Sequence, residues 1–176
     1  MARLPKLEFE SLTTEQAKVH RAICSGPRGE VRGPLAIWLH RPTLADKAQQ
    51  LGQYCRYDSS LPPRLSELAI LVTARIWRSE FEWQSHETPA REAGLADTVI
   101  SALSNDEEPA FTQDDESVVY RVTRELNLNR KVSNDLYREA EQLLGRDALI
   151  DLVGVLGYYS LISMTINAFE VDPIST

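Results

Sequence analysis

The sequence contains few cysteines and no excess of basic residues. Cys24 and Cys55 are the only thiols in 176 residues, and they form neither a CxxC pair nor a metal-ligand spacing, which argues against a disulfide framework or a zinc site. The formal net charge of −7 argues against general nucleic-acid binding, because that affinity depends on basic contacts with phosphates. We therefore expect no nucleic acid among the partners.

The sequence also lacks signals for export. Its start, MARLPKLEFESL, has no continuous apolar core of the kind found in secretory signals, and a reduced cytoplasmic setting fits the two thiols. Residues 152–169 form an uncharged run that reaches the lower limit for a membrane span. Because glycines, tyrosines and hydroxyl-bearing residues interrupt it, we expect a buried helix, packed partly against another subunit, and no membrane.

No alternation of apolar and polar residues persists long enough to indicate a strand. With 43% hydrophobic and 26% charged residues, the composition is that of a globular chain large enough for one core. The sequence therefore predicts an all-α, single-domain helical bundle over residues 1–176, with about seven or eight helices.

The N-terminal part is predicted to contain a helix followed by a loop. A helix capped by Thr13 or Thr14 is expected to end at Gly26. The next segment, GPRGEVRGP, cannot continue a helix because of its glycines and prolines. Such a loop could border a pocket, but a plain connector is the preferred interpretation.

A central helix is predicted to begin at Pro62 and Pro63. Within its apolar run lies Glu67, where loss of water would raise the pKa of the carboxyl group. The alternative is that Glu67 pairs with Arg64 or Arg75, or lies at the helix surface.

Glu82 and His86 stand four residues apart, which on a helix brings both side chains to one face. A carboxylate beside an imidazole is a common arrangement for proton transfer near neutral pH, and Phe81 and Trp83 can keep such a site dry. The alternative is an ordinary surface contact. Pro89 predicts a kink or a restart of this helix.

Three consecutive motifs resemble the carboxymuconolactone decarboxylase family, which shares an all-helical superfamily with the alkylhydroperoxidases. They are an R-x-x-E-L-A-I-L helix, an E-[FY]-E-W-x-x-H segment and an A-x-x-A-G-L ending. The matching positions are Arg64, Glu67, Leu68, Ala69, Ile70 and Leu71; then Glu80, Phe81, Glu82, Trp83 and His86; then Ala90, Ala93, Gly94 and Leu95.

The resemblance implies a lyase of aromatic-compound catabolism that needs neither metal nor other cofactor and acts on a small carboxylated lactone. It implies His86 as general acid/base, Glu82 as its orienting partner and Glu67 as a second proton-transfer group. It also implies an alkylhydroperoxidase-like fold and a homo-oligomer. Residues 1–40 would then be an N-terminal helical extension that compact decarboxylases lack.

The substrate-binding residues are less sharply indicated. A cation must hold the substrate carboxylate, and we expect Arg64, Arg75 or Arg78 in this role, with Trp83 in the pocket wall.

Peroxidase chemistry is expected to be absent. The alkylhydroperoxidases carry a C-x-x-C-x-x-x-H motif, and counting back from His86 places Ser79 and Glu82 at its cysteine positions. The same Glu/His site would also support a hydrolase or an isomerase of small carbonyl compounds. Two further alternatives are a non-catalytic ligand-binding oligomer and, as the weakest, metal binding through Glu82 and His86.

Overall fold

The computed structural model describes residues 3–174, and within that range it is all-α with no β-strand. It contains nine α-helices: α1 (Thr14–Ser25), α2 (Pro34–Trp38), α3 (Pro42–Gln53), α4 (Pro63–Trp77), α5 (Glu80–Glu92), α6 (Asp97–Ser104), α7 (Asp114–Arg124), α8 (Asn134–Leu144) and α9 (Arg146–Phe169). A 3-10 turn, η1 (Phe9–Ser11), and two π-helical turns, η2 (Tyr54–Asp58) and η3 (Glu125–Asn129), accompany them. The predicted all-α class is confirmed. The nine described helices exceed the predicted seven or eight, and the shortest of them, α2, has only five residues.

Helix α4 is the central element. Pro63 opens it, where a proline costs no helical hydrogen bond, and Arg78, in the left-handed conformation with φ of 52°, ends it. Every residue from Leu65 to Ala74 is buried, because α4 packs against α5, α7 and α9. The polar side chains of Ser66, Glu67 and Thr73 are therefore shielded from water by other elements of the protein.

Helix α5 continues through Pro89 without a restart. A proline inside a helix removes one backbone hydrogen bond, but Ala90 is completely buried, which holds the last turn in place. Gly94, with φ of 92°, ends the segment and leads to Leu95, whose amide donates to the carbonyl of Ala90. One continuous helix thus carries both Glu82 and His86.

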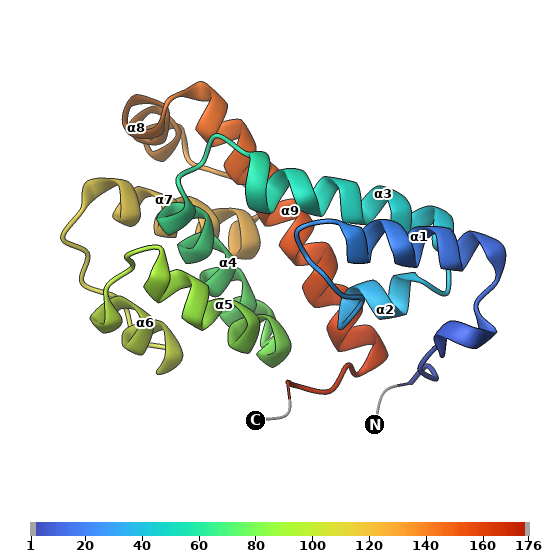
Figure 1. The fold of residues 1–176 in the computed structure, drawn as a ribbon. Helices are drawn as coiled ribbons and strands as arrows, with labels where there is room; N and C mark the ends of the chain where they lie inside the picture. The colour runs from blue at the N-terminus through green and yellow to red at the C-terminus, as the bar shows by residue number, and fades with distance from the viewer. Residues whose placement is uncertain (1–2, 175–176) are drawn as a thin grey trace.

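Helix α9 runs through the middle of the bundle, with α1 to α3 on one side and α4 to α7 on the other (Figure 1). By length and composition α9 is apolar enough to cross a membrane, and 61% of its most apolar window is buried inside the described structure. Its buried residues include Tyr158 and Tyr159.

Asp151 attaches the segment before α4 to α9. Its carboxylate accepts hydrogen bonds from the Ser60 amide at 2.7 Å, the Ser60 hydroxyl at 2.6 Å and the Tyr54 hydroxyl at 2.6 Å. These bonds hold the turn that leads into α4.

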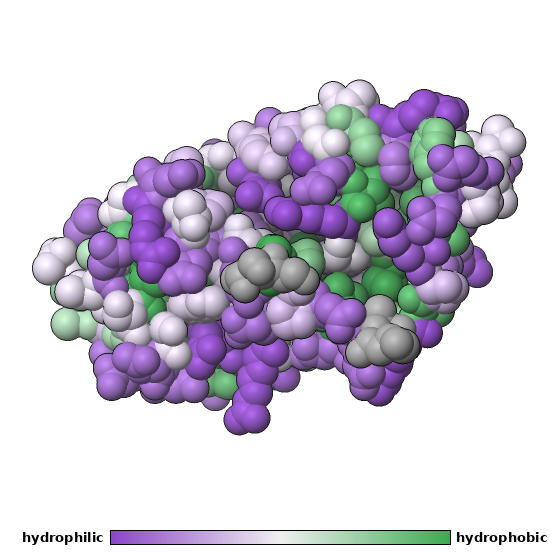
Figure 2. Space-filling model, turned by 60° about the horizontal axis from the view of Figure 1, so that its bottom comes forward, coloured by the Kyte–Doolittle hydropathy of each residue, from purple (hydrophilic) through white to green (hydrophobic). Residues whose placement is uncertain are grey.

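The N-terminal arm lies beside the end of α9. The Arg3 amide donates to the Phe169 carbonyl at 2.9 Å, and the Arg3 guanidinium pairs with Glu170 at 2.7 Å. The first described residue thus lies against the end of α9. The face shown in Figure 2 is covered mainly by hydrophilic residues, with smaller hydrophobic patches between them.

Candidate active site

The three acid–base candidates meet in the interior. Glu67 comes from α4, and Glu82 and His86 come from α5. His86 Nδ1 lies 2.7 Å from Glu67 Oε2, and His86 Nε2 lies 3.5 Å from Glu82 Oε2. With exposed fractions of 7%, 4% and 2% for Glu67, Glu82 and His86, the imidazole is enclosed between two carboxylates. We call Glu67, Glu82 and His86 the acid–base trio.

Glu67 makes the shorter contact with the imidazole, although the sequence pointed to Glu82 as the orienting partner. The i, i+4 spacing brings Glu82 only to 3.5 Å, whereas packing of α4 on α5 brings Glu67 to hydrogen-bond distance from across the interface. When Nδ1 carries a proton, it donates a hydrogen bond to the Glu67 carboxylate, and Nε2 is the ring nitrogen that faces Glu82. Glu67 pairs with neither Arg64 nor Arg75.

Burial changes the chemistry of Glu82. Loss of water raises the pKa of its carboxyl group above the ordinary value, against the opposing effects of His86, Arg56, Arg28 and Arg32. The neutral acid is therefore more favoured here than on a glutamate in water, which suits a group that donates a proton.

Two tyrosines of α9 cover the imidazole. The ring of Tyr159 meets that of His86 edge to face, with centroids 5.1 Å apart, and Tyr158 packs on Tyr159 in the same way at 5.4 Å. Burial raises the pKa of Tyr158 to about 12, so its hydroxyl keeps its proton at neutral pH. The Tyr158 oxygen accepts a hydrogen bond from Arg28 at 3.2 Å and can donate its own proton elsewhere.

Glu82 and His86 open onto a cavity of about 190 Å³. Tyr158, Tyr159 and three arginines, Arg28, Arg32 and Arg56, also line it. Arg28 and Arg32 belong to the loop between α1 and α2, so this loop borders the site and the preferred interpretation as a plain connector was wrong. Glu67 does not line the cavity and lies behind the imidazole.

Arg75, Arg78 and Trp83 do not reach this cavity. They line a second one of about 680 Å³, at the end of α4 and the start of α5. The Arg75 guanidinium pairs with Asp106 at 2.9 Å and lies over the Trp83 ring, 5.4 Å from its centroid. These expected substrate-binding residues are therefore separated from the cavity onto which His86 opens.

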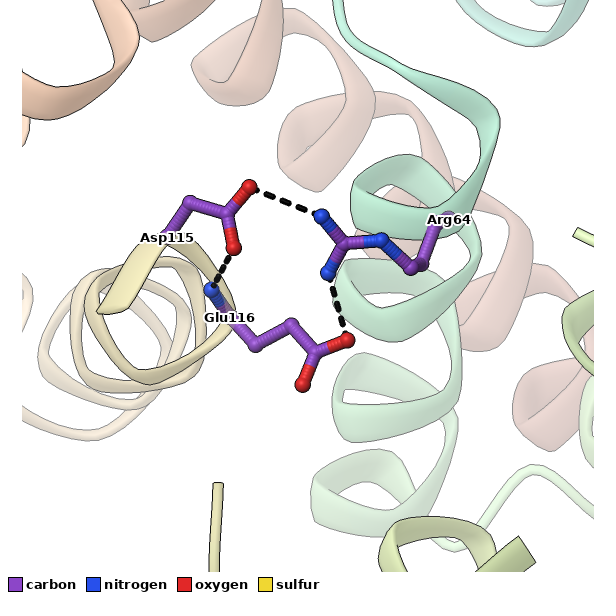
Figure 3. Close-up of polar contacts among 3 residues, drawn as sticks. All are labelled: Arg64, Asp115 and Glu116. Atoms are coloured by element: carbon purple, nitrogen blue, oxygen red, sulfur yellow. Dashed lines mark hydrogen bonds and ion pairs between the residues drawn. The ribbon is translucent and has the colours of Figure 1, made fainter. Parts of the chain in front are cut away.

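Arg64 is engaged in a structural ion pair. Its guanidinium contacts Asp115 at 2.8 Å and also Glu116, both from the first turn of α7 (Figure 3). The Asp115 carboxylate also accepts the Glu116 amide at 2.7 Å. We call this group the α4–α7 brace. With both carboxylates paired to it, Arg64 is not available as the cation of the acid–base site.

Neither cysteine lines the cavity. Cys55 is buried, and loss of water raises the pKa of its thiol to about 11, which disfavours the reactive thiolate. Within residues 3–174, no group of three or more His, Cys, Asp or Glu side chains has the arrangement of a metal site.

Sequence comparison places the motifs in a known family. Residues 42–125 match the sequence model of the carboxymuconolactone decarboxylase family. Among proteins of curated function, none gives a significant match.

Solved structures with the same fold extend over most of the chain. An uncharacterised peroxidase-related protein from Silicibacter sp. TM1040 is similar, with 14% identity and a TM-score of 0.78 over 99% of this chain and 92% of that one. A peroxidase-related protein with an alkylhydroperoxidase AhpD core, from Ralstonia eutropha JMP134, has 12% identity and a TM-score of 0.77 over 98% and 92% of the two chains. A protein of unknown function from Agrobacterium tumefaciens has 14% identity and a TM-score of 0.71 over 82% and 100%. The fold is therefore that of the AhpD-like helical proteins.

Proposed function

We propose that this chain, of which residues 42–125 match the sequence model of the carboxymuconolactone decarboxylase family, is a cofactor-independent acid–base enzyme acting on a small carboxylated lactone or a related carbonyl compound. The observation that carries the proposal is the acid–base trio, in which a buried imidazole lies between two carboxylates and opens onto a cavity. Burying three ionisable groups costs stability, and a catalytic role accounts for that cost.

Each member of the trio has a distinct role in this mechanism. Glu67 holds the imidazole through Nδ1 and stabilises the imidazolium when it forms. Glu82 and His86 face the substrate and exchange protons with it. The Tyr158 hydroxyl, which keeps its proton, can donate to a carbonyl oxygen of the substrate.

In a decarboxylation, the bond between the carboxylate carbon and its neighbour breaks, and the electron pair moves into a conjugated carbonyl to give an enolate. A proton is then added at carbon and the carbonyl re-forms. The neutral acid of Glu82 is suited to supply that proton. The Glu82 carboxylate left behind takes a proton from solvent water, which Nε2 of His86, 3.5 Å away, can relay. A cavity of about 190 Å³ restricts the substrate to a small molecule.

The test is turnover of a panel of carboxylated lactones and β-keto acids, followed by CO2 release and ultraviolet absorbance. His86→Gln and Glu67→Gln should each lower kcat by at least about a hundredfold, because each removes a proton-transfer or orienting group. His20→Gln, on α1 and outside the cavity, is the matched control and should act as wild type.

The same assay separates the alternatives. Ring opening or isomerisation without CO2 release, lost in His86→Gln, would make the protein a hydrolase or an isomerase that uses the same trio. Tight binding of these compounds with no turnover in the wild type would refute the enzyme and favour a ligand-binding protein.

We also propose a homo-oligomer formed through α9. Its exposed side includes a stripe of large apolar residues at helical spacing: Ile150, Val153, Leu161 and Met164. Such contiguous apolar surface is typical of protein interfaces. Light scattering with size-exclusion chromatography should show an oligomer for the wild type and a smaller species for Val153→Glu. A wild-type monomer at micromolar concentration would refute this proposal.

A further inference from the structure

Three arginines surround the cavity from segments outside α4 and α5. Arg28 and Arg32 come from the loop between α1 and α2, and Arg56 comes from η2. Arg28 and Arg32 also lie outside the residues that match the family model. Their charges therefore belong to this chain's own cavity and not to the shared motif.

Two of these guanidinium groups have no carboxylate partner within the described residues. Arg32 pairs with Glu30 at 3.2 Å. Arg28 donates only to the Tyr158 hydroxyl, and its Nε atom is buried without a hydrogen-bond partner among residues 3–174. Arg56 contacts the ring of Tyr57, 5.5 Å from its centroid. Most of the other arginines that are not fully exposed pair with Asp or Glu, as Arg64 does in the α4–α7 brace.

A buried donor without a partner is costly, because it has lost water and gained nothing in exchange. Arg28 and Arg56 both line the cavity, so an anionic ligand there would supply the carboxylate partner that neither guanidinium has. A carboxylate suits this role, because a guanidinium presents paired N–H groups that match its two oxygens.

The packing around Arg28 holds the guanidinium in place. Gly52 on α3 faces both the Tyr158 hydroxyl and Arg28, and a Cβ there would come within 2.1 Å of the hydroxyl oxygen and 2.4 Å of Arg28 Nη2. The backbone of α3 thus approaches the Arg28–Tyr158 pair more closely than any other residue type would allow.

We propose that Arg28 and Arg56 form the subsite for a substrate carboxylate and so select small carboxylic acids. The proposal rests on the proposed function for the meaning of "substrate", but the subsite itself can be tested by binding alone. It makes the loop between α1 and α2 a determinant of specificity, although it lies before the family motifs.

The first experiment is calorimetric titration of the wild type with malonate, succinate, inorganic phosphate and dimethyl succinate at low ionic strength. Binding of a dicarboxylate below roughly 10 mM, with no binding of the uncharged ester, is expected. Arg28→Met and Arg56→Met should each weaken it about tenfold or more, because each removes charged hydrogen bonds. Arg21→Met, an exposed arginine of α1, is the matched control and should bind as the wild type does.

A second pair of variants tests the geometry with every charge retained. Gly52→Ala should weaken carboxylate binding, because its methyl group displaces Arg28 and Tyr158. Gly154→Ala on α9, where a Cβ meets nothing within 4 Å, should leave binding unchanged. Circular dichroism establishes that each variant is folded.

Several outcomes would overturn the subsite. These are no carboxylate binding by the wild type, equal binding in Arg28→Met and Arg56→Met, or phosphate bound more tightly than every carboxylate. His86→Gln separates this proposal from the proposed function, since it should lose turnover and keep carboxylate binding. Turnover that needs His86 but not Arg28 or Arg56 would overturn the subsite alone, and arginine-dependent binding without any turnover would overturn the proposed function alone.

Discussion

Replacing Arg64 with methionine is expected to destabilise the protein without changing the acid–base site. The substitution keeps most of the apolar stem but leaves Glu116, only 3% exposed, as a buried carboxylate without its cation. Breaking a buried ion pair by removing one partner typically costs about 3–5 kcal/mol. Since the Arg64 and Asp115 side chains are 18% and 32% exposed, water relieves part of this, and we expect about 3 kcal/mol.

Urea unfolding followed by circular dichroism measures this loss, which corresponds to a fall in Tm of roughly 10 °C. The double variant Arg64→Met/Glu116→Gln should recover about 1–2 kcal/mol, because no charge then remains buried without a partner. Arg121→Met is the matched control. It breaks a paired Arg–Glu contact between α7 and α8 whose side chains are 42% and 44% exposed, and its unfolding should match the wild type within error.

Arg64→Met as stable as the wild type, or a double variant less stable than the single one, would show that the α4–α7 brace does not stabilise the protein. A third contrary result is an Arg64→Met variant that unfolds normally but loses carboxylate binding. That result would return Arg64 to the substrate-binding role that the sequence indicated.

Three single residues, Glu82, Asp151 and Gly33, should each change the stability of the protein when they are replaced. Because burial raises the pKa of Glu82, the folded protein binds a proton there more tightly than the unfolded chain does, and the free energy of unfolding falls as pH rises above about 4.5. Glu82→Gln should therefore be more stable than the wild type at pH 7, and less active. In pH-dependent urea unfolding, this stability difference should vanish near pH 4. A wild type whose stability is flat between pH 5 and 8 relative to Glu82→Gln would contradict this sign. Burial would raise the pKa of Asp151, but hydrogen bonds including those from Ser60 lower it overall. The Asp151 carboxylate therefore stabilises the fold above about pH 4, and this stabilisation is lost as pH falls further. Asp151→Asn should lower the free energy of unfolding by about 1–2 kcal/mol at pH 7 and leave it unchanged at the acid end of the same titration. Gly33→Ala should lower the free energy of unfolding by about 2 kcal/mol, because φ of Gly33 is 55° and a Cβ would lie 2.4 Å from the Phe81 ring. Thermal unfolding measures this loss, and an unchanged Tm would show that the loop can shift.

Local signals in the sequence singled out the members of the acid–base trio, and the family resemblance joined them into one expected site. Glu82 and His86 share a helix at a spacing that fixes their common face, and Glu67 lies in an apolar run whose burial follows from its neighbours. The contact of Glu67 with His86 Nδ1 was not predictable, because it depends on how α4 packs against α5.

The arginines show where such reasoning ends. The sequence left Arg64, Arg75 and Arg78 as alternatives for the cationic role, but partners distant in the chain decide what a guanidinium does. Asp115 and Glu116 engage Arg64, and the end of α4 places Arg75 and Arg78 on another cavity. Arg28 lies in the Gly/Pro-rich loop, for which the sequence allowed a pocket border only as the less preferred interpretation, and no sequence signal pointed to Arg56 in η2.

Arg64 and Glu67 stand three residues apart on α4, yet they affect the protein in opposite ways. Arg64 neutralises carboxylates of α7 and adds stability, whereas Glu67 belongs to a buried cluster whose charges cost stability. Helix α4 is buried from Leu65 to Ala74 and packs against α5, α7 and α9. This packing keeps Glu67 at 2.7 Å from His86 without contribution from the partly exposed contacts of the α4–α7 brace. Stability and acid–base chemistry are therefore separable on this helix. A loss of the α4–α7 brace should lower the free energy of unfolding and leave kcat intact. Neutralising the acid–base trio should instead raise the free energy of unfolding and lower kcat.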